Sequence, residues 1–246
     1  MIKPPDAPST LLAVIASRPK ILLMSLRFSR IFTRGALLTC FLLLASILVC
    51  ARGNFTLDAA IVDAAAKKYG NDARRNLLAW QQFIRDDDST ADLQKLKRVN
   101  SFFNKHTFVD DSIHWNQKDY WATPIEFLAT DGGDCEDFAL AKYFTLKLIG
   151  VAEEKLNLTY VKALNLNQAH MVLTYYEKPG AVPLVLDNLI DVIEPATKRT
   201  DLLPVYTFNG SGLWLAKERG KGNLVGKSDR LKLWNDLLDR MPASLR

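Results

Sequence analysis

The spacing of hydrophobic residues predicts helices in the first part of the chain and again at its end. Apolar side chains recur at intervals of three and four, as they do on one face of a helix. The pair Gly70-Asn71 divides the first of these regions into two helices. The predicted helical regions are 57–85, 91–105, 135–150 and 228–240.

After Gly150 the pattern changes to an alternation of apolar and polar positions, which is typical of strands. The predicted strands are 158–164, 170–176, 182–187 and 204–208. Helices therefore come first, and the strands of a mostly antiparallel sheet follow them. This order predicts an α+β fold, in one domain that covers residues 52–246.

Residues 1–51 have the pattern of a signal peptide. A basic segment precedes the uncharged run from Ala36 to Cys50, which is shorter than the roughly 20 residues of a membrane-spanning helix. Small residues near Ala51 predict cleavage there. An uncleaved N-terminal anchor is the alternative, and both interpretations predict export from the cytoplasm.

The leader accounts for the basic character of the whole chain. The chain has 32 Lys and Arg against 27 Asp and Glu, and residues 1–51 hold six of the basic residues and one of the acids. The remaining 26 of each sign make the mature domain formally neutral. The charge pattern therefore gives no support for binding to nucleic acid.

Cys135 is the only cysteine after the leader, so the mature domain cannot form an internal disulfide. It stands at the start of a predicted helix, directly after Gly132-Gly133, where free backbone N–H groups and the helix dipole favour a thiolate. We expect the glycines to leave room for a substrate backbone. Acidic neighbours make this turn polar, which favours a reactive thiol over a packed one.

A base for this thiol is predicted from strand pairing. The candidate bases are His106, His114 and His170. If the second and third predicted strands form a hairpin centred between Lys178 and Pro179, His170 lies directly opposite Asp187. Cross-strand partners have Cβ atoms about 5 Å apart, close enough for a carboxylate to hold an imidazole. Cys135, His170 and Asp187 are therefore a predicted catalytic triad, with a plain turn role for Asp187 as the alternative.

Carboxylates crowd around the thiol and would raise its pKa. They are Asp131, Asp134, Glu136 and Asp137. Capping of the helix start explains one or two of them, and a bound cation would neutralise the others. Oxygen ligands favour Ca²⁺ over Zn²⁺, although the spacing differs from that of an EF-hand loop.

Two further features of this region have a predicted role. The backbone N–H of Cys135 is a predicted oxyanion donor because it lies at a helix start. Trp115, Tyr120 and Trp121 either line a groove or pack into the core.

Four segments together resemble a known family. They are Trp115, the stretch 120–143 with its Gly-Gly-Asp-Cys-Glu-Asp core, His170-Met-Val-Leu, and Leu186-Asp-Asn188. In these residues the chain resembles the LapG family of bacterial transglutaminase-like cysteine proteinases. The likeness covers essentially the whole mature domain.

The resemblance implies a papain-like, transglutaminase-like core with the nucleophile on a helix and the His and Asp on adjacent strands. By position it implies that Cys135 is the nucleophile, His170 the general base and Asp187 the residue that orients this base. It also implies a calcium site. The positions that correspond to the family's calcium ligands are Asp134 and Glu136, with Asp137 as a third candidate.

The resemblance further implies a periplasmic, calcium-dependent endoprotease. Such an enzyme cuts a large surface adhesin near its N-terminus, within an Ala-Ala-containing motif, which releases the adhesin and disperses a biofilm. It also implies inhibition by an inner-membrane receptor of the LapD type that responds to cyclic-di-GMP.

Two other functions remain open from the residues alone. A transglutaminase-like acyltransferase would form the same acyl-enzyme and pass the acyl group to an amine in place of water. A non-catalytic periplasmic binding protein would keep only the scaffold.

Overall fold

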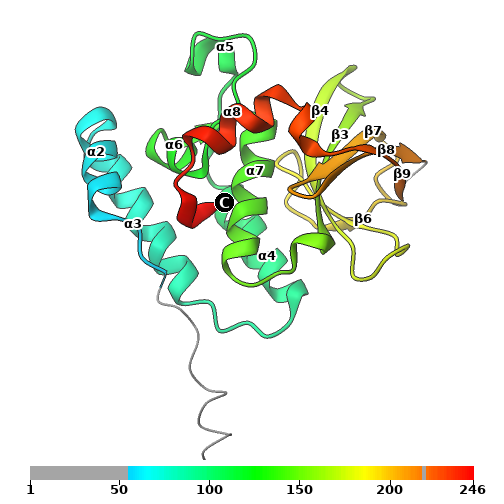
Figure 1. Ribbon diagram of the computed structural model, residues 1–246, viewed down its shortest axis with the longest axis horizontal. Helices are drawn as coiled ribbons and strands as arrows, with labels where there is room; N and C mark the ends of the chain where they lie inside the picture. The colour runs from blue at the N-terminus through cyan, green and yellow to red at the C-terminus, as the bar shows by residue number, and fades with distance from the viewer. Residues whose placement is uncertain (1–54, 218–219) are drawn as a thin grey trace, which may run out of the picture. The chain divides into compact units, whose positions relative to one another are not determined.

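The computed structural model describes residues 55–217 and 220–246 (Figure 1). The predicted leader, residues 1–51, lies outside the described residues, so both the signal peptide and the anchor stay predictions. Residues Asn54–Arg246 belong to one compact unit. Among the described residues, no helix combines the length and the apolar character needed to span a membrane.

Helices come first along the described chain, as predicted (Figure 1). The α-helices are α2 (Ala59–Tyr69), α3 (Asn71–Arg85), α4 (Asp92–Phe103), α5 (Asp111–His114), α6 (Pro124–Ala129), α7 (Cys135–Leu148) and α8 (Lys232–Arg240). The predicted division of the first region is confirmed: Gly70 separates α2 from α3 with a φ of 96°, in the left-handed region that favours glycine.

The main sheet has seven antiparallel strands in the spatial order β6-β5-β4-β3-β7-β8-β9. Their bounds are β3 (Leu156–Ala163), β4 (Gln168–Tyr175), β5 (Leu184–Leu186), β6 (Glu194–Pro195), β7 (Leu202–Asn209), β8 (Gly212–Lys217) and β9 (Gly220–Gly226). The four predicted strands correspond to β3, β4, β5 and β7. A separate parallel pair consists of β1 (Thr107–Phe108) and β2 (Gly132–Gly133).

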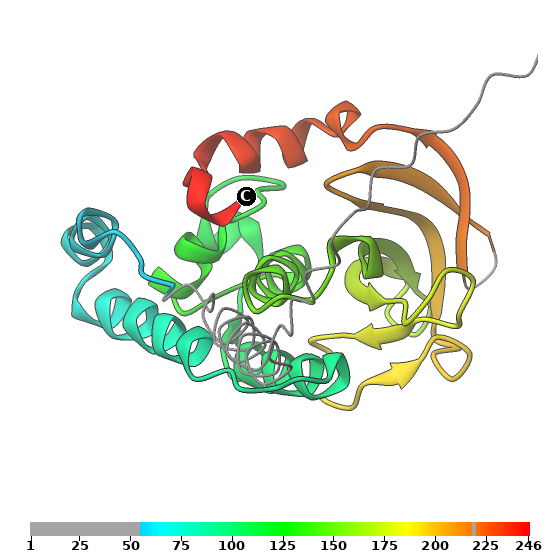
Figure 2. The ribbon, with the colours of Figure 1, turned by 60° about the horizontal axis from the view of Figure 1, so that its bottom comes forward.

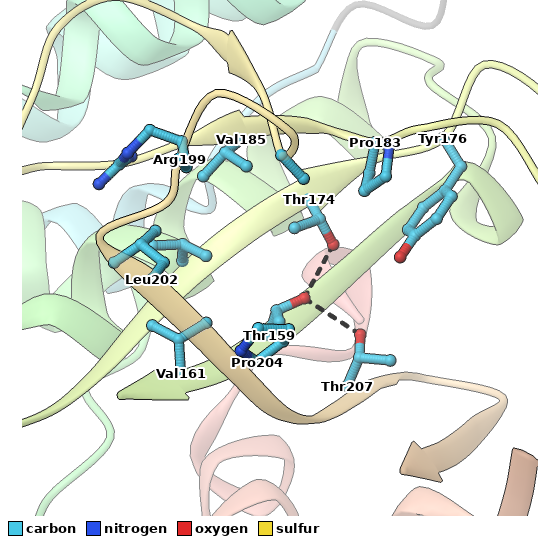
Figure 3. Close-up of a pocket in the computed structure, with 12 residues that line it drawn as sticks. Thr159, Val161, Thr174, Tyr176, Pro183, Val185, Arg199, Leu202, Pro204 and Thr207 are labelled. Carbon is cyan, nitrogen blue, oxygen red and sulfur yellow. Dashed lines mark hydrogen bonds between the residues drawn. The ribbon is translucent and has the colours of Figure 1, made fainter. Parts of the chain in front are cut away.

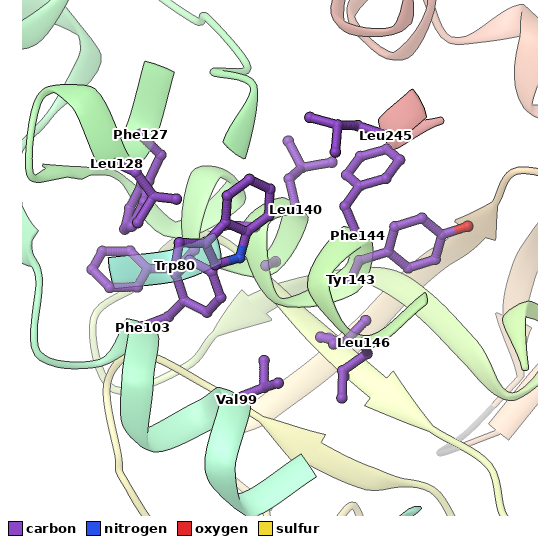
Figure 4. Packing of buried hydrophobic residues seen from close by; sticks show 14 of the residues in the cluster. Trp80, Val99, Phe103, Phe127, Leu128, Leu140, Tyr143, Phe144, Leu146 and Leu245 are labelled. Atoms are coloured by element: carbon purple, nitrogen blue, oxygen red, sulfur yellow. The ribbon is translucent and has the colours of Figure 1, made fainter. Parts of the chain in front are cut away.

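Helix α7 lies between the other helices and the sheet (Figures 1 and 2). Every residue from Asp137 to Leu146 is buried. Figure 4 shows side chains of α3, α4, α6 and α7 meeting in this core, among them Trp80, Phe103 and Leu140. The start of α7 is therefore held in place from several sides, which is the property that a rigid site needs.

The two faces of the sheet belong to different clusters of buried apolar residues. Successive side chains of a strand point to opposite faces. Met171 and Leu173 of β4 belong to the main core with α7, whereas Val172 between them belongs to a smaller cluster. Helices on one face of an antiparallel sheet confirm the predicted α+β class.

Candidate active site

The thiol of Cys135 lies at the first position of α7, against strand β4. The side chain is partly buried, and the backbone N–H of Met171 donates a hydrogen bond to its sulfur. Met171 directly follows His170, so the helix start and the histidine strand meet at this point. The thiol itself donates to Glu136 Oε2, with a sulfur–oxygen distance of 3.0 Å.

The two glycines before the thiol make room for atoms of the protein itself. A Cβ atom on Gly132 would collide with the carbonyl oxygen of Thr107, and one on Gly133 would collide with the carboxylate of Asp137. That carboxylate accepts hydrogen bonds from the backbone N–H groups of Ala122 (2.7 Å) and Asp134 (3.4 Å). These contacts explain both glycines without a substrate backbone.

His170 and Asp187 form a buried hydrogen-bonded pair. His170 Nε2 lies 2.8 Å from Asp187 Oδ1, and the two residues are 3% and 1% exposed. Because Nε2 faces the carboxylate, Nδ1 is the ring nitrogen left for a reacting partner. Asp187 Oδ1 also accepts from the backbone N–H of Leu189 at 3.0 Å, so the residue makes a turn contact in addition.

The predicted register of this hairpin is wrong by two residues. In the structure Leu173 pairs with Leu186, so the hairpin is centred between Pro179 and Gly180. Gly180 takes a φ of 79°, which only glycine adopts readily, and this position fixes the turn. A shift of two residues leaves every side chain on its predicted face. His170 and Asp187 are therefore diagonal neighbours and still meet.

The other two histidines are occupied elsewhere. His106 Nδ1 lies 2.7 Å from Asp131 Oδ1, which also removes Asp131 from the crowd of carboxylates near the thiol. The His114 ring stacks on Trp115 with a centroid distance of 4.5 Å. Burial lowers the pKa of His114, which favours a neutral, packed ring.

The carboxylates beside Cys135 come from two segments of the chain, 111–119 and 134–137. The sequence predicted only the second of these. Oxygen atoms of Asp111, Asp119 and Glu136 lie within 4.8 Å of one another, and the same holds for Asp111, Asp134 and Asp137. The Oδ1 atoms of Asp111 and Asp134 are buried and have no hydrogen-bond partner. Oxygen atoms of this kind fit a hard cation such as Ca²⁺.

Burial and mutual repulsion both disfavour free negative charge in this cluster. Burial, reinforced by Glu136 and Asp137, raises the pKa of Asp134 to about 10. Burial also raises the pKa of Asp111 to about 6. The pKa of the Cys135 thiol is raised as well, first by burial and then by Glu136 and Asp134. The cluster therefore favours protons or a cation over unneutralised carboxylates.

The aromatic residues ahead of the thiol are packed. Trp121 is buried and its ring stacks on Phe208, with centroids 5.6 Å apart. The Trp115 ring lies 4.8 Å from the ring of Tyr120, whose hydroxyl donates to Glu126 Oε1 at 2.7 Å. Core packing, one of the two predicted fates, is confirmed for Trp121.

The sequence matches the model of a known protein family. The family model described as bacterial transglutaminase-like cysteine proteinase BTLCP matches residues 78–208. No curated protein matches the sequence.

Solved structures of LapG from Legionella pneumophila are also similar to it. The EGTA-treated LapG is 44% identical, with a TM-score of 0.66, and the match covers 74% of this chain and 96% of that one. The calcium-bound LapG is 42% identical, with a TM-score of 0.64, and the match covers 76% and 100%. These matches confirm the predicted transglutaminase-like core. The chain belongs to the LapG family of bacterial transglutaminase-like cysteine proteinases.

Proposed function

We propose that the protein is an endoprotease in which Cys135 is the nucleophile, His170 the general base and Asp187 the residue that orients it. The observation that carries this proposal is the buried His170–Asp187 pair beside the start of α7, where the sulfur accepts from Met171 N–H. A thiol, a base and a group that orients the base are the three parts of a cysteine protease site.

In the proposed reaction His170 takes the thiol proton through Nδ1 as the sulfur attacks the scissile carbonyl carbon. His170 then gives that proton to the leaving amine, and a thioester remains on Cys135. Water attacks the thioester, its proton passes by way of His170 to the departing sulfur, and a carboxylic acid is released. The Cys135 backbone N–H, free at the helix start, donates to the oxyanion.

The carboxylates beside Cys135 are the proposed calcium site. One LapG relative is described as calcium-bound. Asp134, Glu136 and Asp137 are the candidates from the sequence, and Asp111 and Asp119 join them through their positions in the fold. Asp137 also has both carboxylate oxygens engaged by backbone N–H groups. A calcium ion held here would neutralise the negative charges that raise the pKa of the thiol.

The proposed setting follows from the resemblance to LapG and from the predicted leader. The enzyme would act in the periplasm, cut the N-terminal region of a large surface adhesin near an Ala-Ala motif, and promote dispersal of a biofilm. An inner-membrane receptor of the LapD type, which responds to cyclic-di-GMP, would inhibit it.

Cleavage of an adhesin N-terminal fragment tests the reaction. Purified residues 52–246 should cut the adhesin fragment into two pieces in Ca²⁺ and should cut less of it in EGTA. The Cys135→Ala variant should not cut it. Mass spectrometry separates hydrolysis from acyl transfer, because an acyltransferase would give a cross-linked product. Cleavage by a folded Cys135→Ala variant would contradict the proposed nucleophile.

Calcium titration by calorimetry tests the metal site. We expect Asp111→Asn to weaken calcium binding by roughly 10-fold or more, because it removes the negative charge of one oxygen ligand. Asp131→Asn is the matched control, since Asp131 lies near Cys135 in the sequence but pairs with His106. Equal affinities in the two variants would exclude Asp111 as a ligand.

A further inference from the structure

The second carboxylate oxygen of Asp187 faces a cation. Oδ1 is engaged by His170 and Leu189, whereas Oδ2 lies 2.8 Å from Nη2 of Arg199. Arg199 is only 5% exposed, so this ion pair is buried. Among the described residues, Arg199 and His170 are the two that form ion pairs with Asp187.

Arg199 is itself held in a fixed orientation. Its Nε donates to Asp201 Oδ1 at 3.0 Å, and its Nη2 donates to Asp201 Oδ2 at 2.7 Å. The residue lies in the turn between β6 and β7, where its backbone N–H donates to Ala196 O. Figure 3 shows its aliphatic part beside Val185 and its guanidinium pointing away from the other labelled residues. The planar fork thus presents one nitrogen, Nη2, to two carboxylates.

The partners of Asp187 keep its carboxylate charged, and Arg199 is one of them. Burial alone would raise the pKa of this carboxyl, but the His170 hydrogen bond, the Leu189 N–H and the Arg199 guanidinium together lower it to about 2. A buried carboxylate without such partners would lose its solvation and take up a proton. Lys142 of α7 and Asp191 are further charged groups on this side of the site.

The backbone of the Asp187 loop has a separate support. Asn104, the C-cap residue of α4, donates through Nδ2 both to the carbonyl oxygen of Asp187 and to Asp191 Oδ1, each at 2.9 Å. Asn100 donates to the carbonyl oxygen of Asp191 at 2.9 Å. These bonds fix where the loop lies. Rotation of the Asp187 carboxylate is fixed by the groups that contact its own oxygens, which are His170, the Leu189 N–H and Arg199.

We propose that Arg199 is a positioning residue for the hydrolysis. Its ion pair with Oδ2 fixes the plane of the Asp187 carboxylate, so that Oδ1 holds the His170 ring with Nδ1 free for the thiol. The inference rests on the proposed triad. Arg199 acts through Asp187 and does not touch the reacting atoms.

Four variants of the mature enzyme test this role by kinetics. We expect Arg199→Met to lower kcat by roughly 100-fold with little change in KM, because a misplaced base costs rate and not substrate binding. Arg199→Lys should regain part of kcat, since it restores the charge without the fork. Asp201→Asn should lower kcat by less than Arg199→Met does. Arg98→Met is the control, because it removes a partly buried ion pair with Asp87 elsewhere in the fold.

A spectroscopic measurement separates positioning from a merely structural role. The ¹⁵N shifts of the His170 ring, assigned by their absence in His170→Gln, report which ring nitrogen carries the proton. Wild type and Arg98→Met should show the proton on Nε2, and Arg199→Met should show a mixture of tautomers. An unchanged tautomer together with an unchanged kcat would overturn the proposal.

The design also covers two complications, which are failure of the proposed function and failure of Arg199→Met to fold. If wild type shows no Cys135-dependent cleavage, the proposed function is wrong, and the ring shifts alone decide whether Arg199 orders the His170–Asp187 pair. If Arg199→Met does not fold, Asp201→Asn decides. A kcat and ring shifts like those of wild type in Asp201→Asn would then overturn the proposal. A lower kcat together with a mixture of His170 tautomers would support it.

Discussion

At the scale of single residues, Lys142 is a basic side chain in the core. It lies on the same helix as Cys135 and is 1% exposed. Its Nζ lies 5.9 Å from the centre of the Phe138 ring. Burial lowers the pKa of this lysine to about 7, although Asp187 and Asp191 oppose the shift. Near neutral pH the residue is therefore close to losing its proton.

This shift predicts a pH dependence of stability. The unfolded chain keeps the Lys142 proton up to about pH 10, whereas the folded chain releases it near pH 7, so stability rises between these values. We expect the free energy of unfolding of wild type to rise relative to Lys142→Met by up to about 5 kcal/mol across this range. Urea unfolding at several pH values measures the difference. Parallel curves for the two proteins would contradict a buried, titrating lysine.

At the scale of elements, the turn that leads into α7 depends on close contacts. Gly133 lies against the carboxylate of Asp137, which holds the backbone N–H groups of Asp134 and Ala122. The first turn of the helix that carries the thiol is therefore tied to the segment before α6. Any bulk added at the glycine must move the carboxylate or the turn.

We expect Gly133→Ala to destabilise the protein by about 2 kcal/mol or more, because the added methyl collides with Asp137. In an Asp137→Ala background the same change should cost much less. A double-mutant cycle in chemical denaturation gives this coupling. Independent, additive effects of the two substitutions would show that the collision is relieved in some other way.

The local patterns predicted most elements but missed short or exposed ones. Helix α6 has too few residues to show a period, although a capping box of Thr123 and Glu126, with Pro124 at the first helical position, signals its start. Strands β8 and β9 extend to the far edge of the sheet, where Leu215 and Leu224 are exposed. Without a buried face, the alternation that reveals a strand is lost.

The candidate site was predictable where its residues are close in sequence or are set by strand pairing. The acids beside Cys135 and the His170–Asp187 pair belong to this group. Asp111 and Arg199 do not, because only the folded chain brings them to the site. No spacing rule connects an acid at the start of the four-residue helix α5 with the start of α7.

At the scale of the whole molecule, the acidic cluster links calcium to pH and stability. When the chain folds without a cation, Asp134 and Asp111 keep their protons to a higher pH. Their pKa values rise from an ordinary 3.8 to about 10 and about 6. The folded chain then binds more protons than the unfolded chain above pH 3.8, so its stability falls as pH rises through this window.

We therefore expect the melting temperature in EGTA to fall between about pH 5 and about pH 8, and to fall less in Ca²⁺. Calcium should also release protons on binding and bind more tightly at higher pH. Thermal scans and calorimetry in buffers of different ionisation enthalpy measure both effects. Calcium binding without proton release would contradict the raised pKa values of these carboxyls.

The order of the elements along the chain has a consequence in time. Cys135 and its acidic neighbours lie among the helices, whereas His170, Asp187 and Arg199 all come from the later, sheet-forming half. A chain that is still being synthesised has its thiol before it has His170, the proposed base. Peptide cleavage by the proposed triad therefore requires that strand β4, which carries His170, has docked on α7 and that the segment after β5 is in place. The proposed protease activity therefore begins only after the second half of the chain has been made.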